Sequence, residues 1–284
     1  MAQPNMGAVA QAELPPPFPP FEPDPEAMFM LLTEDDLPCE DGVPMETDLH
    51  LKQMVLLLEV LELHWAEREN WYAGGNMFLY FSPRQIKTEY FRGPDFFAVL
   101  GVPHRQRKSY VVWQEQKIPD VIIELLSDTT REFDKTEKKR IYQDDLRVPE
   151  YFWFDPHTHE WAGFELRDWQ YQPIEPDEKG RLISKRLGLA LIPREGWFQN
   201  YGGTWLRWET LDGELLPSAE EMARAAQIKA DAAQRDAEAA QRETEAARRE
   251  TEAARREKQA SEQRAAELEA MLAKYQAQFG KLPE

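Results

Sequence analysis

The hydrophobic pattern is most informative at residues 119–126, a short and nearly all-apolar run rich in β-branched side chains. A proline opens the run and a Ser-Asp-Thr-Thr cluster follows it, which predicts a strand that is buried on both faces and ends in a turn. One acid interrupts this run, because Glu124 shares a strand face with Ile122 and Leu126. An unpaired carboxylate there would cost several kcal/mol or give up its charge. Glu124 therefore requires a partner.

The segment that follows, residues 128–142, supplies a candidate partner. Asp134, Lys138 and Tyr142 recur every four residues and would line one face of a helix packed on the strand. Lys138 is therefore expected near Glu124. Two interpretations remain open for this arrangement: a buried Glu–Lys pair that only ties the helix to the sheet, and a catalytic site.

Apolar periodicity predicts the remaining elements. One stripe of apolar residues at helical spacing predicts a core helix over residues 48–67. Short apolar and aromatic runs, bounded by Gly, Pro or polar residues, predict strands at residues 77–81, 95–100, 110–113, 151–155, 159–166, 168–173, 181–192 and 204–209.

The order of these elements predicts an α/β or α+β fold with a mixed β-sheet core and flanking helices. The strand at 151–155 follows the basic helix as a βαβ crossover would. The strands at 95–100 and 119–126 should meet, so that Asp95 lies beside Glu124. The later strands, 181–192 and 204–209, are expected to form an outer, largely antiparallel extension of the sheet.

Composition divides the chain into three parts. Residues 1–46 are rich in proline and acid and predict a disordered leader. Residues 47–212 hold the apolar patterns and predict the core domain. Residues 213–284 become rich in Ala, Glu, Arg and Gln with a 3,4 spacing of Ala and Thr, which predicts a long helix. A solvated single helix and a parallel coiled-coil homodimer both remain open for this tail.

Charge and cysteine content limit the function classes. The chain has 34 basic and 52 acidic residues, and its formal charge of −18 argues against a nucleic-acid scaffold. Any contact with DNA should be local or metal-assisted. A single cysteine, Cys39, excludes an internal disulfide, and no apolar run is long enough to span a membrane. We expect a cytoplasmic protein with no membrane contact.

The acids also suggest a metal site. Mg²⁺ prefers oxygen ligands, usually one or two carboxylates plus water. Asp120 and Glu124 lie four residues apart on one strand, roughly 13 Å at about 3.3 Å per residue, too far to share an ion. Asp95 comes from another strand and is the better co-ligand, which leaves Asp120 as a strand-mouth residue with at most a supporting role. Two carboxylates with a lysine between them suit metal-assisted phosphodiester hydrolysis.

Four segments together resemble the putative restriction endonuclease family that is abundant in cyanobacteria. They are Pro94-Asp95 before an apolar strand, Ile123-Glu124-Leu125-Leu126-Ser127, the Asp134, Lys138, Tyr142 series, and residues 148–156 (Val-Pro-Glu-Tyr-Phe-Trp-Phe-Asp-Pro). The similarity covers about residues 48–210, and the helical tail also resembles tails in that family. That family in turn resembles the PD-(D/E)XK nuclease superfamily.

The resemblance implies roles for individual residues. Asp95 matches the aspartate of the PD motif and Glu124 the acid of the third motif. Leu126 stands where the superfamily usually has its lysine, so the resemblance points to Lys138 on the following helix, with Lys135 as the substitute if the helix is rotated.

The implied activity is that of a Mg²⁺- or Mn²⁺-dependent DNA endonuclease, and the heptads of the tail could supply a homodimer for cutting both strands. The alternative function is a catalytically inactive nuclease fold that acts as an interaction module through its C-terminal helix.

Overall fold

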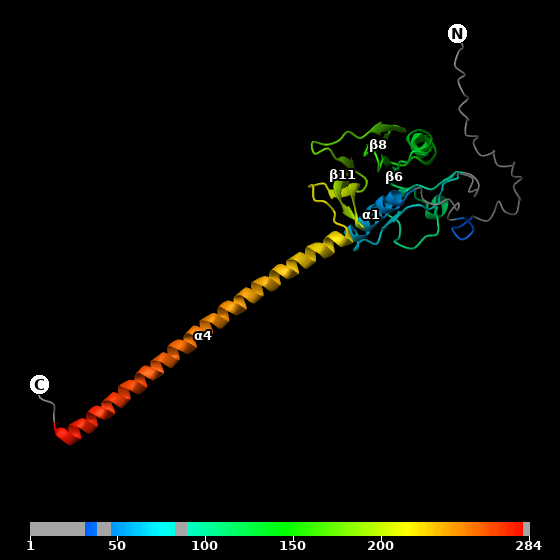
Figure 1. The fold of residues 1–284 in the computed structure, drawn as a ribbon. Coiled ribbons are helices and arrows are strands. Elements are labelled where there is room, and N and C mark those ends of the chain that lie inside the picture. The colour runs from blue at the N-terminus through cyan, green and yellow to red at the C-terminus, as the bar shows by residue number, and fades with distance from the viewer. Residues whose placement is uncertain (1–31, 39–46, 83–89, 281–284) are drawn as a thin grey trace, which may run out of the picture. The chain divides into compact units, whose positions relative to one another are not determined.

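The computed structural model describes residues 32–38, 47–82 and 90–280. Its elements are α1 (Asp48–His64), β1 (Trp71–Gly74), β2 (Leu79–Tyr80), β3 (Phe91–Arg92), β4 (Phe96–Leu100), β5 (Tyr110–Val111), α2 (Val112–Glu115), β6 (Val121–Leu125), α3 (Arg131–Phe133), the π-helices η2 (Asp134–Lys138) and η3 (Ile141–Leu146), β7 (Glu150–Phe154), β8 (Trp161–Arg167), β9 (Gln170–Pro173), β10 (Leu182–Ser184), β11 (Leu189–Phe198), β12 (Tyr201–Thr210) and α4 (Ala219–Phe279) (Figure 1).

The central sheet is mixed, as the sequence predicted. Its six strands follow the order β1-β4-β6-β7-β8-β9. β6 pairs antiparallel with β4 and parallel with β7, and the helical segment between β6 and β7 makes the predicted crossover. Two three-stranded sheets, β10-β11-β12 and β3-β2-β5, accompany it. The fold is therefore α+β with flanking helices and a long C-terminal helix.

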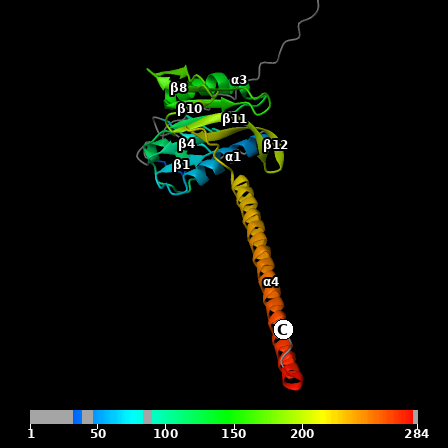
Figure 2. The ribbon, with the colours of Figure 1, turned by 90° about the vertical axis from the view of Figure 1, so that its left-hand side faces the viewer.

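Alternation along β6 separates two hydrophobic clusters. Val121, Ile123 and Leu125 face the cluster that includes α1 and the β10-β11-β12 sheet. Ile122 faces the other cluster, which the crossover helices cover. Glu124 shares the face of Ile122 because side chains alternate along a strand, so the acid points toward the crossover helices. Figure 2 shows α1 alongside β12, where the Gln53 side chain bonds the backbone of Leu206 in both directions.

Three parts of the main fold differ from the sequence-based expectation. The sequence pattern missed β1, which pairs with β4 at the sheet edge. The single strand expected at 181–192 is two strands, because the chain turns at Gly188, where φ is +68°. These strands form a separate sheet with β12 rather than an extension of the central one. Residues 112 and 113, expected as strand, begin the short helix α2.

Part of the leader packs against the core. Leu37 is buried, the Trp113 indole donates to the Leu32 carbonyl at 2.7 Å, and the Tyr80 hydroxyl donates to the Pro38 carbonyl at 2.8 Å. Residues 32–38 are thus ordered, contrary to the expectation for a disordered leader. Residues 1–31 and 39–46 lie outside the described part of the chain.

Contacts divide the chain into two units, residues 1–220 and 221–284. Residues 213–220 belong with the first unit, since Leu216 is buried and its backbone nitrogen donates to the Trp208 carbonyl at 2.9 Å. The second unit is the continuous helix α4, whose side chains are exposed along nearly its whole length. Within the described residues, no helix has the length and apolar character needed to cross a bilayer.

One packing constraint gives a stability test. A Cβ at Gly163 would lie 2.6 Å from two ring carbons of Phe152, whereas a Cβ at Gly203 would meet nothing within 4 Å. We predict that Gly163→Ala lowers the free energy of unfolding by about 1–3 kcal/mol through overpacking, while Gly203→Ala does not lower it. Urea unfolding followed by tryptophan fluorescence measures both, and all nine tryptophans lie between residues 65 and 208. Equal losses in the two variants would contradict this account.

Candidate functional site

Glu124 is held at the centre of a buried polar cluster. Its side chain has no exposed surface. Its Oε1 accepts a hydrogen bond from the Tyr142 hydroxyl at 2.7 Å, and its Oε2 lies 3.1 Å from Lys138 Nζ. The predicted approach of the helical segment to the strand is therefore present, and both groups come from the same helix face.

Asp95 completes an acid pair with Glu124. It stands directly before β4, where the antiparallel pairing with β6 sets it beside the end of that strand. Its backbone nitrogen donates to Glu124 Oε2 at 3.4 Å, and its Oδ2 accepts from the Leu125 nitrogen at 2.7 Å. Each carboxyl group affects the ionisation of the other, and the charge of Asp95 contributes to raising the pKa of Glu124.

Lys138 and Asp134 form the other side of the cluster. Lys138 Nζ lies 2.8 Å from Asp134 Oδ1, so one ammonium bridges two carboxylates. Asp134 is 1% exposed. Three acids, Asp95, Glu124 and Asp134, therefore surround one lysine, and the fully ionised cluster would carry −3 + 1 = −2 charges.

Burial and like charge shift the ionisation of these groups. Burial raises the pKa of Glu124 to about 7 against the opposing effect of Lys138, and the neighbouring Asp95 raises it further. Burial and the charge of Glu124 raise the pKa of Asp134 to about 6. Burial also raises the pKa of Asp95. Burial alone would lower the pKa of Lys138, but the surrounding carboxylates outweigh it and raise that pKa above its usual range.

The crossover places a four-residue repeat on one face. Residues four apart are neighbours on the surface of a helix, and the crossover also contains two π-helical stretches, whose turns are wider. Asp134 and Lys138 bound the π-helix η2, and Tyr142 lies in η3. Their shared orientation toward Glu124 follows from the four-residue spacing.

Two of the supporting residues lie elsewhere. Asp120 sits just before β6, where it pairs with Arg186 and Lys117 and accepts from the Leu100 nitrogen at 2.8 Å. Its place at the start of the strand is the one the spacing argument gave it, away from Glu124. Lys135 lies over the Trp153 ring at 4.1 Å and pairs with Glu160 at 3.3 Å, so it does not enter the cluster.

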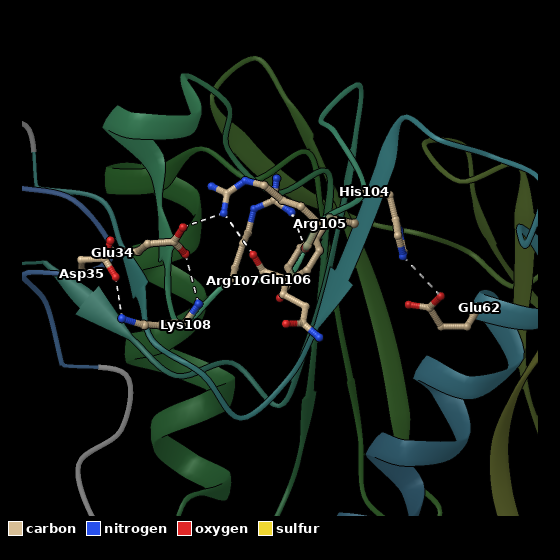
Figure 3. Close-up of a pocket in the computed structure, with 9 residues that line it drawn as sticks. Glu34, Asp35, Glu62, His104, Arg105, Gln106, Arg107 and Lys108 are labelled. Atoms are coloured by element: carbon tan, nitrogen blue, oxygen red, sulfur yellow. Dashed lines mark hydrogen bonds and ion pairs between the residues drawn. The ribbon is translucent and has the colours of Figure 1, made fainter.

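One cavity is shown in Figure 3. It measures about 760 Å³, and residues 104–108, which follow β4, form one side of it. Asp95 precedes β4, so the cavity and the acid pair lie toward opposite ends of that strand. Figure 3 shows Glu34 and Asp35 facing this loop, with Arg105 at 2.6 Å from Glu34. Its exposed cations are already matched by carboxylates.

A second cavity, of about 320 Å³, was not predicted from the sequence. Its residues come from three separate segments, at 81, 90–92 and 137–145. The sequence around Arg92 indicates only a break before the next strand, because Gly93 and Pro94 follow it. Apolar periodicity carries no signal for a cavity assembled from such distant segments.

The donor set of the acid cluster fits a divalent cation. Two neighbouring carboxylates offer hard oxygen ligands, and the two excess negative charges of the fully ionised cluster match the charge of Mg²⁺ or Mn²⁺. In the described ranges, no group of three His, Cys, Asp or Glu side chains is arranged to hold a metal ion. Asp95 and Glu124 would therefore hold the ion with water or substrate oxygens in the other positions, which suits a cation that keeps several waters.

Comparison with known proteins identifies the family. The family described as Uma2, putative restriction endonuclease, matches residues 41–192, more than half of the chain. The chain belongs to the Uma2 family. No curated protein matches it. Solved structures that match include a putative nuclease belonging to DUF820 from Anabaena variabilis, with a TM-score of 0.36 and 14% identity over 47% of this chain and 72% of that one.

The Uma2 match spans the whole acid cluster, since residues 41–192 include Asp95, Glu124, Lys138 and Tyr142. It leaves out β12 and α4. The resemblance that the sequence segments suggested is thereby confirmed at the level of the family. The roles of individual residues stay predictions.

The raised pKa of Glu124 predicts a pH-dependent stability. A carboxyl group whose folded pKa lies above its unfolded value binds more protons when folded, so stability falls as pH rises from about 4.5 through about 7. Glu124→Gln removes this titration. Urea unfolding in metal-free buffer at pH 5 and pH 8 should show a loss on the order of 2–3 kcal/mol in the parent and a smaller loss in the variant.

Glu132→Gln is the matched control, because Glu132 is an exposed carboxylate on the same crossover segment. It should keep the pH dependence of the parent. If Glu124→Gln keeps it as well, Glu124 is not the group that titrates in this range.

Proposed function

We propose that this chain is a metal-dependent endonuclease that hydrolyses phosphodiester bonds of DNA, with Asp95 and Glu124 as ligands of Mg²⁺ or Mn²⁺ and Lys138 as a catalytic cation. The observation that carries the proposal is the pairing of the buried Glu124 with the partly buried Asp95, beside the ammonium of Lys138. A site built only for stability would balance these charges, whereas this cluster would carry two excess negative charges when fully ionised.

The residues of the proposed site have different roles. A cation bound there would polarise a phosphoryl oxygen and lower the pKa of a coordinated water. Tyr142 fixes the orientation of the Glu124 carboxylate through its 2.7 Å hydrogen bond. Asp95 is anchored by the Leu125 backbone nitrogen, so both carboxylates are held in place before substrate arrives.

Lys138 is suited to electrostatic stabilisation rather than to proton removal. The neighbouring carboxylates raise its pKa above its usual range, so the ammonium stays protonated near neutral pH and cannot take a proton from water. It can hold the attacking water in place or offset negative charge that develops on the phosphate. Asp134 keeps the ammonium aimed at the acid pair through the 2.8 Å ion pair.

Cleavage assays test the acid pair directly. We expect Asp95→Asn and Glu124→Gln to reduce Mg²⁺-dependent cleavage of plasmid DNA by at least about 100-fold, because each change removes charge from the metal site. Asp128→Asn and Glu132→Gln make the same chemical changes at exposed positions on the neighbouring segment. Those two controls should cleave as the parent does. An acid-pair variant that cleaves at the parental rate would refute the proposal.

Metal binding provides a second readout that does not depend on the choice of substrate. Titration calorimetry with Mn²⁺ should detect binding to the parent and to the two control variants, and Glu124→Gln should lose it. Proton release should accompany binding near pH 7, because the pKa of Glu124 is raised to about 7 and a metal ligand must be deprotonated. Equal binding by the parent and Glu124→Gln would place the metal elsewhere.

A second candidate function rests on the tail. Leu268, Met271, Leu272 and Tyr275 follow one stripe of α4, and each is 48–66% exposed. Apolar residues at this spacing suit a helix partner. We propose that this stripe joins two copies of the chain, or binds another helix if the nuclease fold serves as an inactive interaction module.

Sedimentation equilibrium distinguishes these cases. A parent that dimerises should become monomeric in the double variant Leu268→Gln and Leu272→Gln, since glutamine keeps helix propensity and removes the apolar surface. Ile228→Gln is the control, because Ile228 is an exposed apolar residue of α4 outside the stripe. A parent that stays monomeric at tens of micromolar would exclude the homodimer.

A further inference from the structure

The 320 Å³ cavity adjoins the acid cluster from two directions. Arg92 on its rim stands three residues before Asp95 in the chain. On its other side, Glu137, Arg140 and Ile141 line it from the crossover segment. Lys138 and Tyr142, which contact Glu124, are the immediate neighbours of those residues. The cavity thus borders the face of the crossover segment adjacent to the one that carries Lys138 and Tyr142.

Within the part of the chain that the structure describes, Arg92 has a side-chain nitrogen without a partner. Its Nη1 donates to the Phe91 carbonyl at 2.6 Å, and its Nε is buried without a hydrogen-bond partner. Among the described residues it forms no ion pair, although its charge contributes to lowering the pKa of Glu137 behind the larger effect of Arg140. A buried guanidinium nitrogen without a partner is costly, which suggests that a ligand completes the site.

The other cation of the cavity is already neutralised. Arg140 pairs with Glu137 at 3.0 Å and approaches Asp144 and Asp145 at 3.8 Å. Among the described residues that line this cavity, Arg92 is therefore the cation with charge available for an anion. A phosphate diester carries one negative charge and suits the fork of a guanidinium.

Tyr90 presents an aromatic face beside Arg92. The side chain is 46% exposed, and its ring meets the buried Phe81 ring edge to face at 6.0 Å. The backbone of Tyr90 has φ of +51°, a left-handed conformation that is uncommon for a bulky residue. A hydrogen bond from the Phe81 nitrogen to the Tyr90 carbonyl at 2.9 Å holds it there. Strained backbone of this kind concentrates at binding sites.

We propose that this cavity holds one unstacked nucleotide of the DNA strand, next to the phosphodiester that the acid pair acts on. The base stacks on Tyr90, and Arg92 binds the adjoining phosphate. Aromatic faces and arginine are the groups that bind single-stranded nucleic acid, and the cavity is within the size range of small-ligand sites. The inference rests on the proposed nuclease function and adds to it where the strand lies.

Binding of a labelled single-stranded oligonucleotide, followed by fluorescence anisotropy at low salt, tests the cavity. All proteins carry Glu124→Gln, so that the strand stays intact and one like charge is removed. Tyr90→Ala and Arg92→Gln should each weaken binding about tenfold. Tyr90→Phe keeps the aromatic face and should retain most of the affinity. Tyr201→Ala and Arg167→Gln are the matched controls, with Tyr201 52% exposed and Arg167 at the surface.

Each outcome decides the question. Loss in Tyr90→Ala and Arg92→Gln, with the controls unchanged, supports the cavity as the nucleotide site. Equal affinity in all variants, or no binding in any, overturns it. Magnesium-dependent DNA cleavage by the parent protein is measured separately. If the parent cleaves DNA but Tyr90→Ala and Arg92→Gln leave oligonucleotide binding unchanged, this inference is refuted and the nuclease proposal stands.

Discussion

The burial of Glu124 in the central sheet is the constraint on which the rest of the site depends. A carboxylate in an apolar strand must be hydrogen-bonded and paired, or it gives up its charge. In this fold Tyr142 donates to it, Lys138 pairs with it, and burial together with the neighbouring Asp95 raises its pKa. Each response requires a particular neighbour, so the position of one acid fixes the placement of two other segments.

The crossover between β6 and β7 meets these requirements with a four-residue repeat. Asp134, Lys138 and Tyr142 lie on the side of Glu124 because residues four apart share a helix face. The crossover also contains the π-helices η2 and η3. Such wide turns are rare and occur often at functional sites. Their presence beside the acid cluster agrees with a functional role for this connection.

Much of this arrangement was predictable from the sequence, because the patterns that specify it lie within short segments. Glu124 lies in an apolar run, and polar residues recur every four positions in the segment after it. The sequence therefore predicts a partner for Glu124 on that segment, whether the segment is an α-helix or a π-helix. The sequence also predicted that the strands at 95–100 and 119–126 meet, and β4 and β6 pair antiparallel. The separate β10-β11-β12 sheet was not, because periodicity shows that a strand exists and not which strand it joins. The cavity at Arg92 is formed by side chains from three segments, so no periodic pattern in the sequence predicts it.

Asp120, just before β6, and Glu124, within it, show that charge balance rather than burial distinguishes the candidate site. Asp120 and Glu124 are both at most 1% exposed and belong to the same run. Asp120 faces two cations, Arg186 and Lys117, and accepts a backbone hydrogen bond, so its charge is met without a ligand. Glu124 shares a single ammonium with Asp134 and lies against Asp95. The charge of Asp120 is balanced by its own neighbours, whereas the cluster around Glu124 becomes neutral only when it binds protons or a divalent cation. A structural role explains the acid at one end of the strand, and the excess charge at the other end calls for a bound ion.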